Sequence, residues 1–147
     1  MPTATLAELM DALATQIRGV LDNVTNVAVQ VEPRWITNPT PPTIDIYPAD
    51  PSTDQDLRAF GDVVGETVLT VRARVDMSDS TASQDLLLAF MDDNDPLSIA
   101  RAMDDDDTLG GIASSVDVRS QSGYVRVVEG GDYLGCLWQV VVVKATS

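Results

Sequence analysis

The feature that most constrains the fold is a run of alternating residues from Val63 to Met77. Small or apolar residues fill most odd positions of this run, and the even positions include Glu66, Arg72 and Arg74. Alternation with period two predicts an extended strand with one face against a core. At ~3.3 Å per residue the run would reach roughly 50 Å, which is long beside a usual strand of about 5 to 6 residues. We therefore expect a core built on a sheet in which one strand bends or projects.

Further strand patterns lie on both sides of this run. The last of them, Tyr133 to Ala145, is mainly apolar at both odd and even positions. This pattern predicts a central strand covered on both faces or one buried in an assembly. Gly130 to Asp132 predicts a tight hairpin turn before it, and a further turn is expected near Ser122 and Gly123. The other predicted strands span about 27–31, 43–47, 112–119 and 124–129.

Two segments between these strands predict loops. The segment between Pro33 and Pro42 has prolines that remove backbone donors and favour extended structure, so it is expected to form a stiff loop. The polar stretch at about 50–61 predicts an exposed connection.

The N-terminal segment from about 5 to 22 has the spacing of an amphipathic helix. Its apolar residues recur at intervals of three and four, which puts them on one face. Thr5 and Glu8 have the spacing of a capping box, in which each side chain satisfies the other residue's backbone N–H. The sequence therefore predicts a helix at about 5–22 that is capped by Thr5, with Thr3 as an alternative cap.

A pair of helices is expected in the middle of the chain. The first contains the apolar residues of 86–91, with Thr81 and Gln84 as its capping box. The second is predicted at 97–103, because Asp95 suits the N-cap and Pro96 the first helical position. Gly110 and Gly111 are expected to end this helical region.

The order of these elements predicts the fold class. It runs α-β-β-β-α-α-β-β-β, with hairpins dominating the connections, which indicates an α+β fold: a mainly antiparallel sheet with one long strand or hairpin, and the N-terminal helix and central helix pair on one face. A chain of 147 residues with 44% apolar residues is expected to form one domain, residues 1–147.

Charge and composition exclude several classes of function. The chain has no histidine, so it has no His-activated nucleophile and no His-ligated zinc. Nine Lys and Arg against 23 Asp and Glu give a net charge of −14, which disfavours binding of DNA or RNA phosphates. The single cysteine, Cys136, allows no internal disulfide. Neither a membrane helix of about 20 apolar residues nor a signal peptide is apparent, so we expect a soluble, unsecreted protein.

Clusters of aspartates are the only candidate metal ligands. Carboxylates suit Ca²⁺ or Mg²⁺, but the spacing of a calcium-binding EF-hand is absent, and solvated helix ends are the simpler interpretation. An acidic run at the end of a helix opposes the helix dipole, which suggests an external constraint such as a lumen or a partner's basic patch. No catalytic, metal-binding or cofactor-binding residue is predicted. The clusters comprise Asp92, Asp93 and Asp95, and then Asp104, Asp105, Asp106 and Asp107.

The cysteine and the aromatic residues suggest core and interface positions. Cys136 and Trp138 share one face of the last strand and are expected in the core. Trp35 lies in a Pro-rich loop, where it either anchors an interface or is covered by its own chain. Arg72 and Arg74 either pair with acids of a neighbouring subunit or lie solvated on the strand. The candidate subunit or partner interface is Trp35, Ile36, Arg72, Arg74 and Tyr133.

Taken in order, several phrases of the sequence resemble one family. These are LAELMDALATQIRGVL, PRWITNPTPPTIDIYP, ETVLTVRARV, DPLSIARAM, TLGGIASSVDVR and GDYLGCLWQVVV. Over nearly the whole chain they resemble the tail terminator, or neck, proteins of long-tailed phages that infect actinobacteria.

The resemblance implies a structural virion protein without a catalytic residue. Six copies would form a ring at the head-proximal end of the tail tube, stop its polymerisation and meet the head-tail connector protein, after assembly in the host cytoplasm. Genomic DNA would pass the ring without specific binding. We hypothesise that Asp104 to Asp107 face this lumen, where their charge would repel phosphate.

Three other functions stay open at this point. The chain could be another head-tail connector or the tail-tube subunit itself. It could be a metal-dependent hydrolase that uses the aspartate clusters. It could also be a small module that binds a basic host protein through an acidic face.

Overall fold

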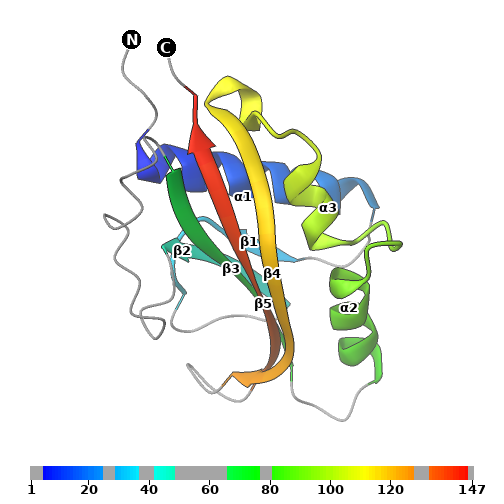
Figure 1. The fold of residues 1–147 in the computed structure, drawn as a ribbon. Helices are drawn as coiled ribbons and strands as arrows, with labels where there is room; N and C mark the ends of the chain where they lie inside the picture. The colour runs from blue at the N-terminus through cyan, green and yellow to red at the C-terminus, as the bar shows by residue number, and fades with distance from the viewer. Residues whose placement is uncertain are drawn as a thin grey trace.

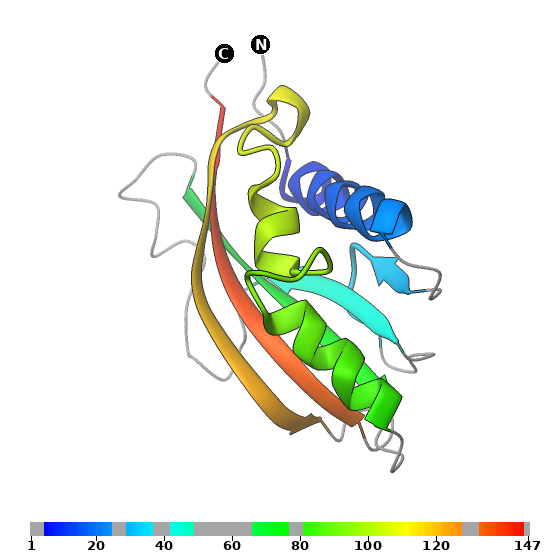
Figure 2. The ribbon, with the colours of Figure 1, turned by 90° about the vertical axis from the view of Figure 1, so that its right-hand side faces the viewer.

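In the part of the chain that the structure describes, a five-stranded sheet carries three helices on one face, and Figures 1 and 2 show this arrangement. A computed structural model describes residues 5–24, 29–36, 42–48, 66–76, 81–127 and 133–145. The architecture confirms the predicted α+β class with an N-terminal helix and a central helix pair. The elements are α1 (Leu6–Val24), β1 (Gln30–Glu32), β2 (Thr43–Pro48), β3 (Glu66–Asp76), α2 (Thr81–Met91), α3 (Ile99–Asp104), the 3-10 turn η3 (Leu109–Gly111), β4 (Ala113–Val127) and β5 (Tyr133–Lys144).

The sheet has the strand order β1-β2-β3-β5-β4 and is mainly antiparallel. Only β1 and β2 pair in parallel among the described strands. The predicted long strand is β3, whose described part has 11 residues and pairs with β5 along its whole length, from Glu66 opposite Val143 to Asp76 opposite Tyr133. The expected positions 63–65 and 77 lie outside the described residues.

The hydrophobic core lies between the helices and one face of the sheet. Alternate residues of β3 and β5 point into it, as period two requires. The helices contribute apolar residues at helical spacing from α1, together with Leu87 and Phe90 of α2. On the strands, the core side chains are Leu69, Val71, Ala73 and Val75 of β3, and Cys136, Trp138, Val140 and Val142 of β5.

Helix α1 begins with the predicted capping box and is tied to its neighbours by two long side chains. Thr5 N donates to Glu8 Oε1 at 3.0 Å and Glu8 N donates to Thr5 Oγ1 at 3.1 Å. Gln16 Nε2 donates to the carbonyls of Ala102 and Met103, which satisfies two acceptors at the end of α3. Arg18 Nη2 donates to the carbonyl of Val31 in β1.

The third helix starts later than the sequence predicts. Asp95 and Pro96 form a turn, in which Asp95 Oδ1 accepts from Leu97 N and the Asp95 carbonyl accepts from Ser98 N. Ser98 is the actual N-cap, with its Oγ accepting from Arg101 N at 3.3 Å. The prediction failed because Asp95 and Ser98, three residues apart, can both cap a helix. Asp95 supports a turn, and Ser98 caps α3. The expected end of this helical region at Gly110 and Gly111 is confirmed, and both have positive φ.

The predicted turn at Ser122 and Gly123 is wrong, because β4 runs through these residues as one strand. A register irregularity between Gly123 and Val125 replaces the turn. A Cβ atom added to Gly123 would lie 2.6 Å from Met91 Cε and 2.7 Å from Cys136 Sγ. Glycine is therefore present because α2 and β5 approach the backbone closely, not because the chain turns.

Several other expected features fall outside the described residues. They are part of the loop between Pro33 and Pro42, the connection at 50–61 and the turn at Gly130 to Asp132. The antiparallel pairing of β4 with β5 is the arrangement that a hairpin produces.

Replacing Gly123 by Ala should destabilise the fold by about 1–3 kcal/mol, because the added methyl group would overlap Met91 Cε and the sulfur of the buried Cys136. Gly19, exposed in α1 with nothing near its hypothetical Cβ, is the matched control. Gly19→Ala should stabilise by about 0.5–1 kcal/mol through helix propensity. Urea denaturation measures both free energies of unfolding, and equal effects would contradict the close approach at Gly123.

Candidate functional site

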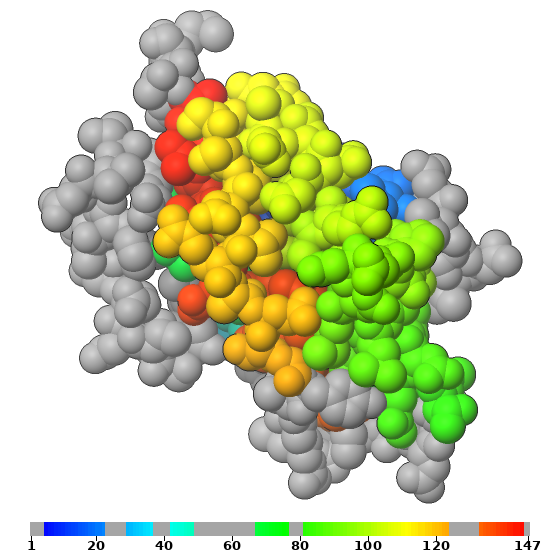
Figure 3. Space-filling model, turned by 45° about the vertical axis from the view of Figure 1, so that its right-hand side comes forward, coloured from blue at the N-terminus to red at the C-terminus, as the bar shows by residue number. Residues whose placement is uncertain are grey.

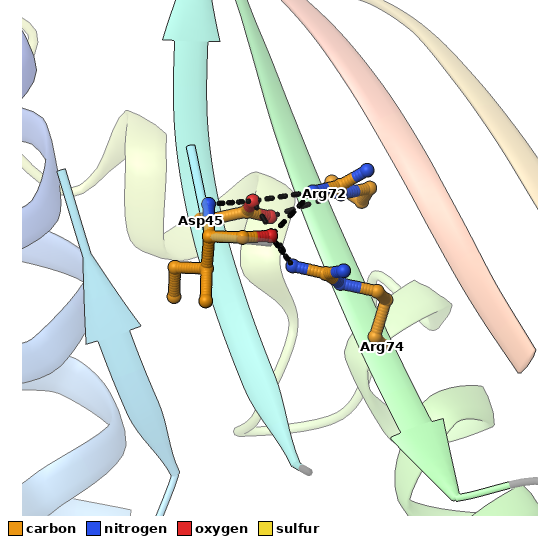
Figure 4. A network of polar contacts seen from close by, with 4 residues as sticks. Asp45, Arg72 and Arg74 are labelled. Carbon is orange, nitrogen blue, oxygen red and sulfur yellow. Dashed lines mark hydrogen bonds and ion pairs between the residues drawn. The ribbon is translucent and has the colours of Figure 1, made fainter. Parts of the chain in front are cut away.

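A buried ion cluster lies on the sheet face opposite the helices (Figure 4). Arg72 binds Asp45 through two nitrogens, with Nε 3.1 Å from Oδ1 and Nη2 2.6 Å from Oδ2. Arg74 Nη2 donates to Asp45 Oδ2 at 3.2 Å. The relative exposure of the whole residues is 0% for Asp45 and Arg74 and 4% for Arg72. One carboxylate therefore joins two adjacent strands through two guanidinium groups.

Strand register explains why these three side chains meet. Asp45 of β2 is directly opposite Arg72 of β3, and Arg74 is opposite Thr43, two residues along. Alternation puts Arg72 and Arg74 on the same face as Asp45, at the direct and diagonal positions of the ladder. The alternating pattern that sends Leu69, Val71 and Ala73 into the core therefore also builds the ion cluster.

The cluster also fixes the segment that carries Trp35. Ile36 N donates to Asp45 Oδ2 at 3.1 Å, and the Ile36 carbonyl accepts from Arg74 Nη2 at 2.8 Å. The Trp35 ring lies over the guanidinium of Arg72, 4.7 Å from its Cζ, and meets the Tyr47 ring edge-on with centroids 4.5 Å apart. Trp35 nevertheless keeps 42% of its surface exposed. The exposed indole of Trp35 is thus held in place by the side chains of Arg72 and Tyr47.

This geometry suits holding and presenting a side chain rather than proton transfer. Asp45 accepts from Ile36 N, from Arg74 Nη2 and from two nitrogens of Arg72, which accounts for about four lone-pair positions of a carboxylate. Oδ2 accepts three of these bonds and Oδ1 accepts one, and all four donors belong to the same chain.

The structure corrects the sequence interpretation of Arg72 and Arg74. The solvated alternative is wrong, because both side chains are buried and pair with Asp45 of the same chain. Sequence reasoning missed Asp45 and Tyr47. The sequence did carry a signal. One acid lies among the alternate polar positions of 43–47, and two arginines lie at the alternate polar positions of the next predicted strand.

The remaining candidate interface residues are brought to the same face. Ile36 is half-buried and contributes its backbone to the cluster. Tyr133 is half-buried, with its ring centroid 5.8 Å from the Cζ of Arg74. All five predicted interface residues therefore form or surround the ion cluster, and Trp35 is the most exposed of them.

The acidic run Asp104 to Asp107 is exposed at the end of α3 and in the turn that follows. Asp106 has a local role, because its carboxylate accepts from the N–H and hydroxyl of Thr108 and from Gly110 N. These bonds lower the pKa of Asp106. Burial, and then the nearby carboxylates of Asp107 and Asp117, raise the pKa of Asp104. Asp106 therefore caps the turn that follows α3. This local role explains one of the four acids without a lumen or a partner's basic patch.

Cys136 and Trp138 occupy the core as predicted, each with no exposed surface. Trp138 Nε1 donates to Gln121 Oε1 at 2.6 Å. Burial raises the pKa of the Cys136 thiol to about 12, which keeps it protonated near neutral pH.

No group of three metal-ligating side chains gathers within the described part of the chain. None of the described helices is long and apolar enough to span a membrane.

Comparison with models of protein families found no match, and comparison with curated proteins found no significant relative.

Replacing Asp45 by Ala should cost about 3–5 kcal/mol of stability, because two buried guanidinium groups lose the carboxylate they share. Asp11, which pairs with Arg34 at the surface, is the control, and Asp11→Ala should cost less than about 1 kcal/mol. Urea unfolding curves give both values. A loss at Asp45 no greater than that at Asp11 would show that the cluster does not hold the two strands together.

Cys136 should resist thiol reagents in the folded protein at pH 8, since burial keeps the thiol both covered and protonated. We expect modification by a disulfide reagent to be complete in urea while the native chain is still unreacted. Absorbance of the released thiolate follows both reactions. Comparable rates with and without urea would mean that β5 is not packed as described.

Proposed function

We propose that this chain is a tail terminator, a structural protein of the phage virion. Copies of it form a homo-oligomeric ring, expected to be a hexamer, at the head-proximal end of the tail. The ring stops polymerisation of the tail-tube protein and joins the tube to the head-tail connector protein. Support comes from the ordered sequence phrases described above, which resemble this family over nearly the whole chain.

The structural observation that carries the proposal is that Trp35 is exposed and yet held in place by its neighbours. Interfaces are enriched in tryptophan, because a large rigid ring buries much area at a low cost in side-chain entropy. Trp35 is exposed by 42%, yet Arg72, Tyr47 and the backbone bonds of Ile36 hold its segment. An exposed aromatic ring that is already ordered is suited to a contact between subunits or with the tube.

The acidic surface has a role in this proposal. In the ring, Asp104 to Asp107 face the lumen, where their negative charge keeps DNA phosphates from binding during transit. All four side chains are exposed in the single chain. A reconstruction of the ring with these residues on its outer wall would contradict this part of the proposal.

Negative-stain electron microscopy of the purified protein, alone and with tail tubes, tests the function. We expect closed rings, and rings that cap one end of a tube. Open filaments would identify a tail-tube subunit instead. Particles that bind the connector but not the tube would identify another neck protein, and a protein that stays monomeric under all these conditions would overturn the proposal.

Trp35→Ala should abolish or strongly weaken ring formation while the chain stays folded. Leu88, the other large hydrophobic residue with high exposure among the described residues, is the matched control, and Leu88→Ala should leave assembly unchanged. Light scattering after size exclusion measures the assembly state, and circular dichroism checks the fold. Intact rings in Trp35→Ala would remove Trp35 from the interface.

A further inference from the structure

Trp35 lies in a segment whose backbone does little to orient its side chain. Residues 33–36 belong to neither a helix nor a strand. Trp35 is also 42% exposed, so burial in a core does not fix the ring. An exposed side chain ordinarily changes rotamer within picoseconds to nanoseconds. The orientation of this indole therefore depends on the side chains that touch it.

Two side chains from neighbouring strands contact the indole. Tyr47 of β2 meets it edge-on, with ring centroids 4.5 Å apart and an angle of 61° between the ring planes. The Cζ of Arg72, in β3, lies 4.7 Å from the centroid of Trp35 and 5.2 Å from that of Tyr47. Edge-on aromatic pairs and cations over rings both attract beyond the area they bury. Each of the three groups thus holds the other two.

The groups that hold Trp35 are themselves fixed. Tyr47 is 5% exposed and Arg72 is 4% exposed. Arg72 donates to Asp45 through two nitrogens, as Figure 4 shows, and such a bidentate pair restricts the guanidinium in direction as well as distance. Ile36, the next residue after Trp35, is bound to Asp45 through its backbone N–H. The indole therefore rests on two strands whose own side chains are packed.

The contacts on the other side of Trp35 are weaker. Arg34 Nη1 lies 2.9 Å from Asp11 Oδ1 of α1, but the two side chains are 53% and 57% exposed. An exposed ion pair contributes little, because water and salt screen it. The orientation of Trp35 thus depends mainly on Tyr47 and Arg72.

The other tryptophan, Trp138, is not available for a contact of this kind. It belongs to the lining of a cleft of about 540 Å³ beside β4, on the side of the sheet that carries the helices. Figure 3 shows this side of the molecule, with β4 in yellow to orange beside the green helices. Trp138 has no exposed surface, and its Nε1 donates to Gln121. A dissolved fluorescence quencher therefore reaches Trp35 in preference to Trp138, so the two rings can be observed separately.

We propose that Tyr47 is a positioning residue for the Trp35 contact. Its ring, together with the guanidinium of Arg72, keeps the indole in one orientation before a partner arrives. Ordering one side chain during binding costs roughly 2- to 10-fold in affinity, and a ring that is already ordered avoids this cost. The effect on assembly rests on the proposed function, whereas the order of Trp35 in the single chain does not.

Time-resolved fluorescence anisotropy of the unassembled chain measures the motion of Trp35. The signal of Trp138, recorded in Trp35→Phe, is subtracted, and quenching by acrylamide confirms which ring is observed. In the wild-type chain Trp35 should rotate only with the whole molecule. Tyr47→Leu removes the ring but keeps an apolar side chain, and it should add a fast local motion of Trp35. Tyr47→Phe keeps the ring and should restore the wild-type decay.

Light scattering over a range of protein concentrations measures the effect on assembly. Tyr47→Leu should raise the concentration of half-assembly roughly 2- to 10-fold, and Tyr47→Phe should not. Ile46→Ala is the control for stability, because Ile46 is next to Tyr47 in β2 but belongs to the core. This variant should lower the unfolding midpoint in urea while both the motion of Trp35 and assembly stay as in the wild type.

Fast local motion of Trp35 in the wild-type chain would overturn the inference, and this result needs no variant that has to fold. The inference also fails if Tyr47→Leu changes neither the motion of Trp35 nor assembly, or if Ile46→Ala weakens assembly as much as Tyr47→Leu does. In each of these cases wild-type rings would still form, so the proposed function would stand. A wild-type chain that never assembles would instead overturn the proposed function, and with it the role of Tyr47 in a contact.

Discussion

The carboxylate of Asp45 is the constraint on which one half of this structure depends. Asp45 belongs to β2 and accepts hydrogen bonds from two arginines of β3 and from the segment before β2, so β2, β3 and this segment are held by one group. Buried ion pairs are weak evidence of net stability, because desolvation offsets the attraction between the charges. Their geometry is demanding, however, and the bidentate contact of Arg72 fixes the register of β2 against β3.

The two faces of the sheet are stabilised by different kinds of interaction. Helices cover one face with apolar side chains, where burial of surface supplies the free energy. The ion cluster and the rings of Trp35 and Tyr47 occupy part of the other face. A single alternating strand serves both faces, which explains why β3 combines a row of aliphatic residues with a row that includes two arginines. Side chains for recognition can therefore be arranged on the second face without disturbing the core.

The sequence determined the fold more clearly than the sites. Period two in 63–77 and the capping box of Thr5 and Glu8 are local signals, and both lead to the observed elements. The continuous β4 was missed because Gly123 is required by neighbours distant in sequence, which no local pattern reports. Asp45 was missed for a similar reason, since its role depends on register across β2 and β3.

Burial of the ion cluster has a consequence for how the protein responds to salt. A net charge of −14 makes the exposed acids repel one another, and dissolved ions screen that repulsion within roughly 10 Å at 0.1 M. The pairs of Asp45 with Arg72 and Arg74 are out of contact with solvent, so the same ions barely weaken them. Raising the ionic strength therefore relieves the electrostatic strain of the surface while leaving the attraction that joins β2 to β3 intact. The fold can tolerate an acidic exterior because its principal ion pairs lie where salt does not reach.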